Sequence, residues 1–141
     1  MTQQGEATKF PQPVAPEESL YRGVIKGWIV VDKETGGRRL SSAAFTSTAG
    51  PLSVDIASKT TPEESLRRGP RFVVVASLVA ALPIRLGYQV LEDPILNRPD
   101  MEDNPAHALI VGPGKGYPIK KSDARKLAQN CSWAVPLPAT D

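Results

Sequence analysis

The sequence has little of what metal sites and disulfide frameworks need, with one cysteine, Cys131, and one histidine, His107, in 141 residues. A lone cysteine cannot form a disulfide within the chain, and a structural zinc site takes four Cys or His ligands at paired spacing. The nearest carboxylate cluster is Asp100, Glu102 and Asp103, which lacks the central glycine and terminal glutamate of a calcium loop. We therefore expect no metal, no cofactor and a reducing compartment.

Long apolar runs and an excess of one charge are also missing. The longest apolar stretch, residues 72–82, is interrupted by Ser77 and is about half the length of a membrane span. Residues 1–6 have neither the basic start nor the apolar run of a signal peptide. The net charge is only +2, so no overall field attracts nucleic acid or anionic lipid. These absences predict a cytoplasmic protein without a membrane or nucleic-acid partner.

Proline, by contrast, is abundant, with 14 residues in the chain, about twice its average usage. Residues 1–18 contain three of them and few apolar side chains, which predicts an extended or disordered tail. Residues 19–141 have a globular composition, and most of their prolines stand between runs of apolar residues. The composition therefore predicts a tail followed by one compact domain of short elements.

Periodicity and turn signals divide this domain into strands and helices. Alternating or β-rich runs predict strands at 20–25, 28–31, 52–56, 71–76, 88–92 and 106–111, and 41–46 fits either a strand or one helical turn. Thr61, Pro62 and Glu64 form a helix start with a capping box, and a second short helix spans 79–86. Ser122 is the predicted N-cap of a third helix that runs to about Cys131. The fold class is α+β, a single domain with a mixed or antiparallel sheet and two or three short helices.

Nucleophilic catalysis would need a nucleophile, a base and a group that orients the base. His107 is the only histidine available as the base. The sequence contains no G-x-S-x-G elbow, and nothing in the order of residues brings these groups together. The conceivable nucleophiles are Ser41, Ser42, Ser53 and Cys131, and the conceivable orienting acids are Asp55 and Asp93.

A glycine-rich segment, residues 111–118, indicates an anion site or a simple turn. Glycines free backbone amides to bind an anion and Lys115 adds charge, but no Ser or Thr follows the lysine as in a P-loop. Residues 112–126 carry five bases and one acid, whereas residues 92–103 carry five acids and one base. Such segments can pair internally, dock a second copy, bind a charged partner or stay solvated. The candidate anion-binding or partner-binding residues are Gly112, Gly114, Lys115, Lys120, Lys121 and Arg125.

Five short blocks occur in an order that resembles a set of small, uncharacterised bacterial proteins. In one-letter code the shared order is YR, SSxAF, SVD, DP and NPAHA, and it covers about residues 20–135. The resemblance implies a bacterial origin and no particular activity.

The chain is also similar, more distantly, to the NAD-cleaving ADP-ribosyltransferase-like group. That group places an arginine on an early strand, as Arg22 follows Tyr21 here, and hydroxyl residues on the next, as Ser41 and Ser42 could supply. The resemblance implies a nucleotide-processing activity that uses Arg22, Ser42 and His107 as catalytic residues. The structural alternative is that Arg22 pairs with an acid such as Asp55.

From the sequence we expect a bacterial accessory or interaction protein. It would bind a protein partner, or a second copy of itself, through the N-terminal tail and the charged loops. The alternative is an NAD- or nucleotide-processing enzyme of the ADP-ribosyltransferase-like type. The sequence leaves open whether the chain is an enzyme.

Overall fold

The structure, a computed structural model, describes residues 11–47 and 50–137. These residues form a six-stranded sheet with the order β6-β7-β4-β1-β5-β8, in which every neighbouring pair is antiparallel. The strands are β1 (Ser19–Ile25), β4 (Leu52–Ile56), β5 (Phe72–Val79), β6 (Gln89–Glu92), β7 (His107–Val111) and β8 (Ser132–Val135). A separate hairpin joins β2 (Ile29–Val31) to β3 (Arg38–Leu40).

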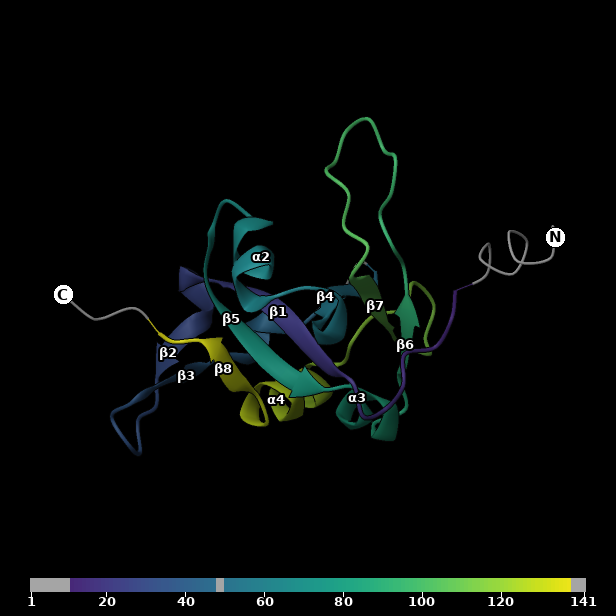
Figure 1. Cartoon of the computed structure of the whole chain (residues 1–141). Helices are drawn as coiled ribbons and strands as arrows, with labels where there is room; N and C mark the ends of the chain where they lie inside the picture. Colours follow the sequence, from purple (N-terminus) through teal and green to yellow (C-terminus); the bar gives the residue numbers. More distant parts are fainter. Residues whose placement is uncertain (1–10, 48–49, 138–141) are drawn as a thin grey trace, which may run out of the picture.

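Within the described residues, three α-helices flank the sheet: α2 (Pro62–Arg67), α3 (Ala81–Arg85) and α4 (Lys121–Gln129). Figure 1 shows α2 and the long loop between β6 and β7 on one side of the sheet, with α3 and α4 on the other. Three single turns of 3-10 helix complete the described chain: η1 (Lys26–Trp28), η2 (Ser42–Ala44) and η3 (Ala57–Lys59). The α+β class with an antiparallel sheet is confirmed.

The hydrophobic core lies between the sheet and α4. Helix α4 buries Ala124, Leu127 and Ala128, and β4 buries Leu52, Val54 and Ile56. Because side chains alternate along a strand, the residues between these, Ser53 and Asp55, belong to the opposite face. This face carries α2 and the loop between β6 and β7 (Figure 1), and the polar side chains of Ser53 and Asp55 lie on it.

The predicted elements agree closely with the structure, with three corrections. Strands β3 and β8 were not predicted, and β5 continues to Val79, so the second helix begins at Ala81. Thr61 does cap α2, because its Oγ1 accepts a hydrogen bond from the Glu64 amide at 3.1 Å. Ser122 is not the cap of the third helix: Lys120 occupies the N-cap position, and Ser122 lies within the first turn.

The part of the predicted tail that the structure describes runs along the outer edge of β6. The Val14 amide donates to the carbonyl of Val90 at 2.8 Å, and the Glu92 amide donates to the carbonyl of Gln12 at 2.7 Å. Val14 is 5% exposed. This segment therefore covers a sheet edge whose backbone groups would otherwise be unpaired. Residues 1–10 of the predicted tail and the last four residues of the predicted domain lie outside the described residues.

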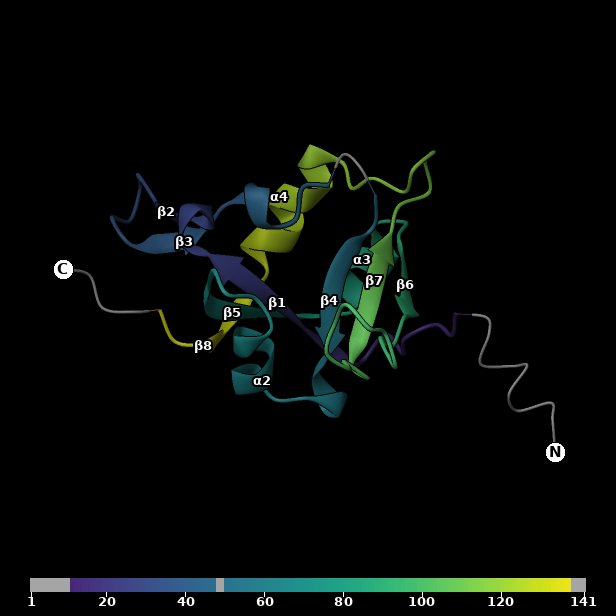
Figure 2. The ribbon, with the colours of Figure 1, turned by 90° about the horizontal axis from the view of Figure 1, so that it is seen from above.

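Strands β1 and β4 pair over a short distance and then diverge. Only Leu20–Ile56 and Tyr21–Asp55 are in register between them, whereas β1 stays paired with β5 along its length. Seen from above, the two strands meet at one end and splay at the other (Figure 2). In the described part of the chain, no helix is long and apolar enough to cross a membrane.

Gly23 permits the close approach of an aromatic ring to β1. A Cβ atom at this position would lie 2.3 Å from the Phe72 ring, whereas one at Gly27 would have no neighbour within 4 Å. We expect Gly23→Ala to lower the free energy of unfolding by about 1–3 kcal/mol, as overpacking does, and Gly27→Ala to have less effect. Urea unfolding of both variants measures the difference, and equal stabilities would contradict the packing.

Candidate functional site

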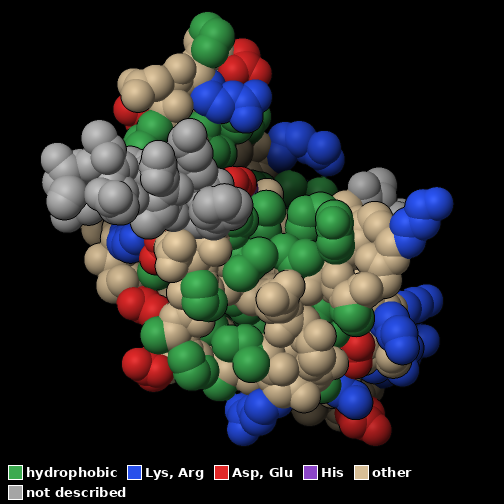
Figure 3. Space-filling model, turned by 90° about the vertical axis from the view of Figure 1, so that its right-hand side faces the viewer, with side chains coloured by type: hydrophobic (Ala, Val, Ile, Leu, Met, Phe, Trp, Pro, Cys, Tyr) green, Lys and Arg blue, Asp and Glu red, His purple; other side chains and the backbone are tan. Residues whose placement is uncertain are grey.

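A cavity of about 650 Å³ lies on the face of the sheet that carries α2. Its floor is made by β1, β4 and β7, one wall is α2, and the other wall is the loop between β6 and β7. Viewed from the side of β6, this loop projects above the body of the molecule (Figure 3). The residues on the floor that carry reactive or polar side chains are Tyr21, Arg22, Ser53, Asp55 and His107.

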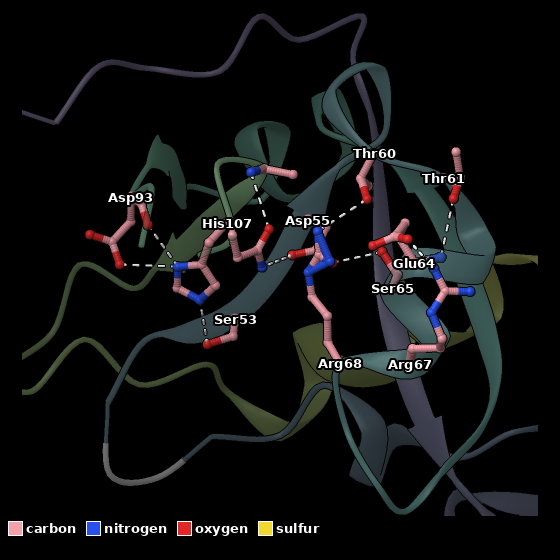
Figure 4. A network of polar contacts seen from close by, with 12 residues as sticks. Ser53, Asp55, Thr60, Thr61, Glu64, Ser65, Arg67, Arg68, Asp93 and His107 are labelled. Atoms are coloured by element: carbon pink, nitrogen blue, oxygen red, sulfur yellow. Dashed lines mark hydrogen bonds and ion pairs between the residues drawn. The ribbon is translucent and has the colours of Figure 1, made fainter. Parts of the chain in front are cut away.

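His107 joins two other polar residues through both nitrogens of its ring (Figure 4). Its Nδ1 lies 3.1 Å from Oδ2 of Asp93 and 2.9 Å from the backbone carbonyl oxygen of the same residue. Its Nε2 lies 3.1 Å from Oγ of Ser53. A hydroxyl, an imidazole and a carboxylate are thus in hydrogen-bonding sequence, which is the arrangement of a nucleophile, a general base and an orienting acid.

These contacts determine the tautomer of the neutral ring. A backbone carbonyl only accepts hydrogen bonds, so Nδ1 of His107 must carry the proton that it shares with Asp93. The other nitrogen, Nε2, is then an acceptor. Ser53 therefore donates its hydroxyl proton to Nε2, the direction that a general base requires.

The register of the sheet brings these residues together from distant parts of the sequence. His107 is directly opposite Asp55 in the β4–β7 ladder, so both side chains lie on the same face. Ser53, two residues before Asp55, shares that face and is the diagonal neighbour of His107. Asp93 follows β6, where its amide donates to the carbonyl of His107 at 2.9 Å.

Asp55 is the centre of a second polar cluster beside the first. It is 8% exposed and accepts hydrogen bonds from Ser65 Oγ at 2.6 Å and Asn104 Nδ2 at 2.9 Å. Nε of Arg68 lies 3.7 Å from the same carboxylate, as Figure 4 shows. Asp55 therefore ties both walls of the cavity, α2 and the loop, to β4.

Arg22 occupies the gap where β1 and β4 diverge. Its Nε donates to the carbonyl of Ala44 and its Nη1 to the carbonyl of Ser53, both at 2.9 Å. The guanidinium carbon also lies 5.1 Å from the centre of the Trp28 ring, a cation–π distance. Burial lowers the pKa of Arg22 to about 10. Arg22 does not use Asp55 as its partner, because that carboxylate is taken by Arg68, Ser65 and Asn104.

Of the three catalytic candidates from the sequence, two share this cavity. Arg22 and His107 both line it, but Ser42 lies in a second cavity, of about 660 Å³, between the β2–β3 hairpin and α4. Ser53 takes the place next to His107 instead. Ser53 and Asp93 are among several candidates in the sequence, and only the strand register selects them.

The predicted anion-binding residues belong to the connection from β7 to α4. Gly112 is required by packing, since a Cβ there would lie 1.9 Å from the carbonyl oxygen of Pro118. The Lys120 amide donates to Oη of Tyr88 at 3.0 Å, and Arg125 lines the second cavity with Ser42. Among the described residues, none of the ion pairs joins the acidic segment 92–103 to the basic segment 112–126. The remaining members of the set, Gly114, Lys115 and Lys121, lie in the same connection or in the first turn of α4.

Cys131, another conceivable nucleophile, is unsuited to that role. It follows α4, and its Sγ donates to the carbonyl of Leu127 at 3.2 Å. Burial raises the pKa of the Cys131 thiol to about 12, so the reactive thiolate is scarce at neutral pH.

No protein-family model matches the sequence, and comparisons with curated proteins and with solved structures find no similar chain. Within residues 11–47 and 50–137, no three His, Cys, Asp or Glu side chains gather in a way that could hold a metal ion.

The hydrogen bonds around Asp55 predict a specific loss of stability. We expect Asp55→Asn to lower the free energy of unfolding by about 1.5–3 kcal/mol, the range for hydrogen bonds to a charged group. Asp100→Asn is the control: its carboxylate is 64% exposed in a pair with Arg98, and such surface pairs contribute about 0–1 kcal/mol. Urea unfolding compares the two, and an Asp55→Asn variant as stable as the control would show that the cluster does not hold the walls.

Proposed function

We propose that this protein is an enzyme that cleaves a small ester, thioester or amide, with Ser53 as its nucleophile. The observation that supports the proposal is the pair of contacts made by His107, with Nδ1 held by Asp93 and Nε2 facing Oγ of Ser53. Asp93 acts as the residue that positions and polarises the ring, and His107 acts as the general base.

The first half of the reaction transfers the acyl group to the enzyme. Oγ of Ser53 attacks the carbonyl carbon while Nε2 of His107 takes its proton. The bond from this carbon to the leaving oxygen, sulfur or nitrogen then breaks, and the leaving group takes the proton from His107. In the second half, water attacks the acyl carbon while Nε2 of His107 takes one of its protons. The bond from this carbon to Oγ of Ser53 then breaks, His107 returns the proton to Oγ, and the acid is released.

The shape of the site also supports a small-molecule reaction. A cavity of about 650 Å³ falls within the range of about 300–1,000 Å³ that is typical of ligand sites. Its walls are held by the buried Asp55 cluster, and a rigid support is what a positioned nucleophile requires.

The two functions expected from the sequence stay predictions. In the tail, the backbone of residues 12–16 bonds to β6 and to Ala81, so a partner that binds this part would contact its exposed side chains, at positions 12, 13, 15 and 16. An ADP-ribosyltransferase-like reaction would have Arg22 and His107 in one cavity, but without Ser42.

A serine-reactive phosphonofluoridate tests the proposal directly. We expect intact-mass analysis to show one adduct, mapped to Ser53, which Ser53→Ala abolishes. His107→Gln and Asp93→Asn should slow labelling, and any hydrolysis of 4-nitrophenyl acetate, by about 10²- to 10⁴-fold, the usual contribution of a general base and its support. Ser58→Ala is the matched control, since Ser58 is exposed and bonds to Glu18 away from His107.

Labelling that is absent, or that is equal in the wild type and Ser53→Ala, would overturn the proposal. Circular dichroism and urea unfolding of each variant check that a lost adduct reflects lost chemistry rather than lost folding.

A further inference from the structure

Arg22 is a mostly buried cation without a carboxylate partner in the described part of the chain. Its two hydrogen bonds go to neutral carbonyl groups, those of Ala44 and Ser53, and its third contact is the face of Trp28. Ala44 is fully buried, whereas Ser53 is exposed on the cavity floor. The guanidinium thus lies in the gap between β1 and β4, and its contact with Ser53 is to the backbone carbonyl of that residue.

The other arginines of this cavity differ from Arg22 in this respect. Arg67 pairs with Glu64, and Arg68 lies 3.7 Å from the carboxylate of Asp55. Their positive charges are balanced within the protein. Arg22 alone among the three arginines that line the cavity makes no ion pair with a described residue.

Arg22 also has N–H groups that are not used in the two hydrogen bonds to Ala44 and Ser53. A guanidinium has five N–H groups in a planar fork, and two of them are used by the carbonyls of Ala44 and Ser53. A buried charge is costly unless it is paired, and burial already lowers the pKa of Arg22. The remaining N–H groups match the geometry of a carboxylate or a phosphate.

We propose that Arg22 binds an anionic group of the substrate, a carboxylate or a phosphate, next to Ser53. This inference rests on the proposed function and narrows its substrate class to small anionic esters, thioesters or amides. The acids of the opposite wall favour a substrate with a single anionic group over a polyanion. Asp100 is paired with Arg98, and Asp103 accepts from the Asn97 amide, but both residues line the cavity and keep their negative charges there.

Anion binding can be measured without catalysis, in the full-length Ser53→Ala protein. Sodium acetate and inorganic phosphate are titrated at constant ionic strength, with chloride as the reference, while ¹⁵N NMR follows the Nε–Hε signal of Arg22. We expect acetate or phosphate, but not chloride, to shift this signal and to bind. The anion that binds more tightly shows whether the group is a carboxylate or a phosphate.

Three variants in the same Ser53→Ala background locate the site. Arg22→Gln should weaken binding about tenfold or more, the loss of hydrogen bonds to a charged group, and Arg22→Lys should weaken it less. Arg67→Gln, on the cavity wall, is the control and should stay within about twofold because Arg67 already has a partner.

An Arg22 signal that neither anion moves beyond the effect of chloride would overturn the inference, as would equal affinities in Arg22→Gln and Arg67→Gln. If Arg22→Gln does not fold, two measurements still test the inference. These are the anion affinity of Arg22→Lys and the shift of the Arg22 Nε–Hε signal in the Ser53→Ala protein. Ser53 labelling is a separate measurement, so an anion site without a reactive serine would contradict only the proposed enzyme.

Discussion

The antiparallel pairing of β4 with β7 is the interaction on which the candidate site depends. Its register places Asp55 opposite His107 and Ser53 opposite Leu109, so three polar side chains share one face. A slip of one residue would turn one strand's side chains to the other face. Ser53 would then move into the core, or Val54 would meet the imidazole. The buried alternation of Leu52, Val54 and Ile56 makes such a slip unfavourable, and the core therefore specifies the site.

Two polar residues, Asp55 and Arg22, hold together the parts of the fold that form the cavity. Asp55 accepts bonds from α2 and from the loop after β6, which holds both walls at a fixed distance from the floor. Arg22 fills the gap between β1 and β4 and bonds to both Ala44 and Ser53. The site thus combines a rigid support for the proposed nucleophile with a cation whose charge the described protein groups leave unbalanced. Both features belong to the folded sheet and are separate from the glycine-rich connection before α4.

Most of the fold could be predicted because its signals are local. The alternation in residues 52–56 predicts β4, and Thr61 with Pro62 predicts the start of α2. Strand β8 was missed because four residues after a helix carry little pattern, and its formation depends on pairing with β5. The predicted N-cap of α4 is wrong because Lys120, the residue at that position, has no capping side chain. Its backbone amide donates a hydrogen bond to the Tyr88 hydroxyl instead.

The site was less predictable, since its contacts join residues far apart in sequence. His107 was recognised as the only available imidazole, but Ser41, Ser42 and Ser53 are equivalent candidates until the strand order is known. The choice between Asp55 and Asp93 likewise depends on which carboxylate reaches Nδ1. The structure assigns Asp93 to His107 and Asp55 to the wall contacts.

The most direct test of this account is the ¹⁵N NMR spectrum of the histidine ring. His107 is the only histidine in the chain, so its two ring nitrogens give the only imidazole signals. We expect the neutral ring to carry its proton on Nδ1 and to leave Nε2 as an acceptor, and we expect Asp93→Asn to perturb the Nδ1 signal. A neutral ring protonated on Nε2 would contradict this expectation. Ring nitrogen signals that are the same in the wild type, Asp93→Asn and Ser53→Ala would contradict it as well.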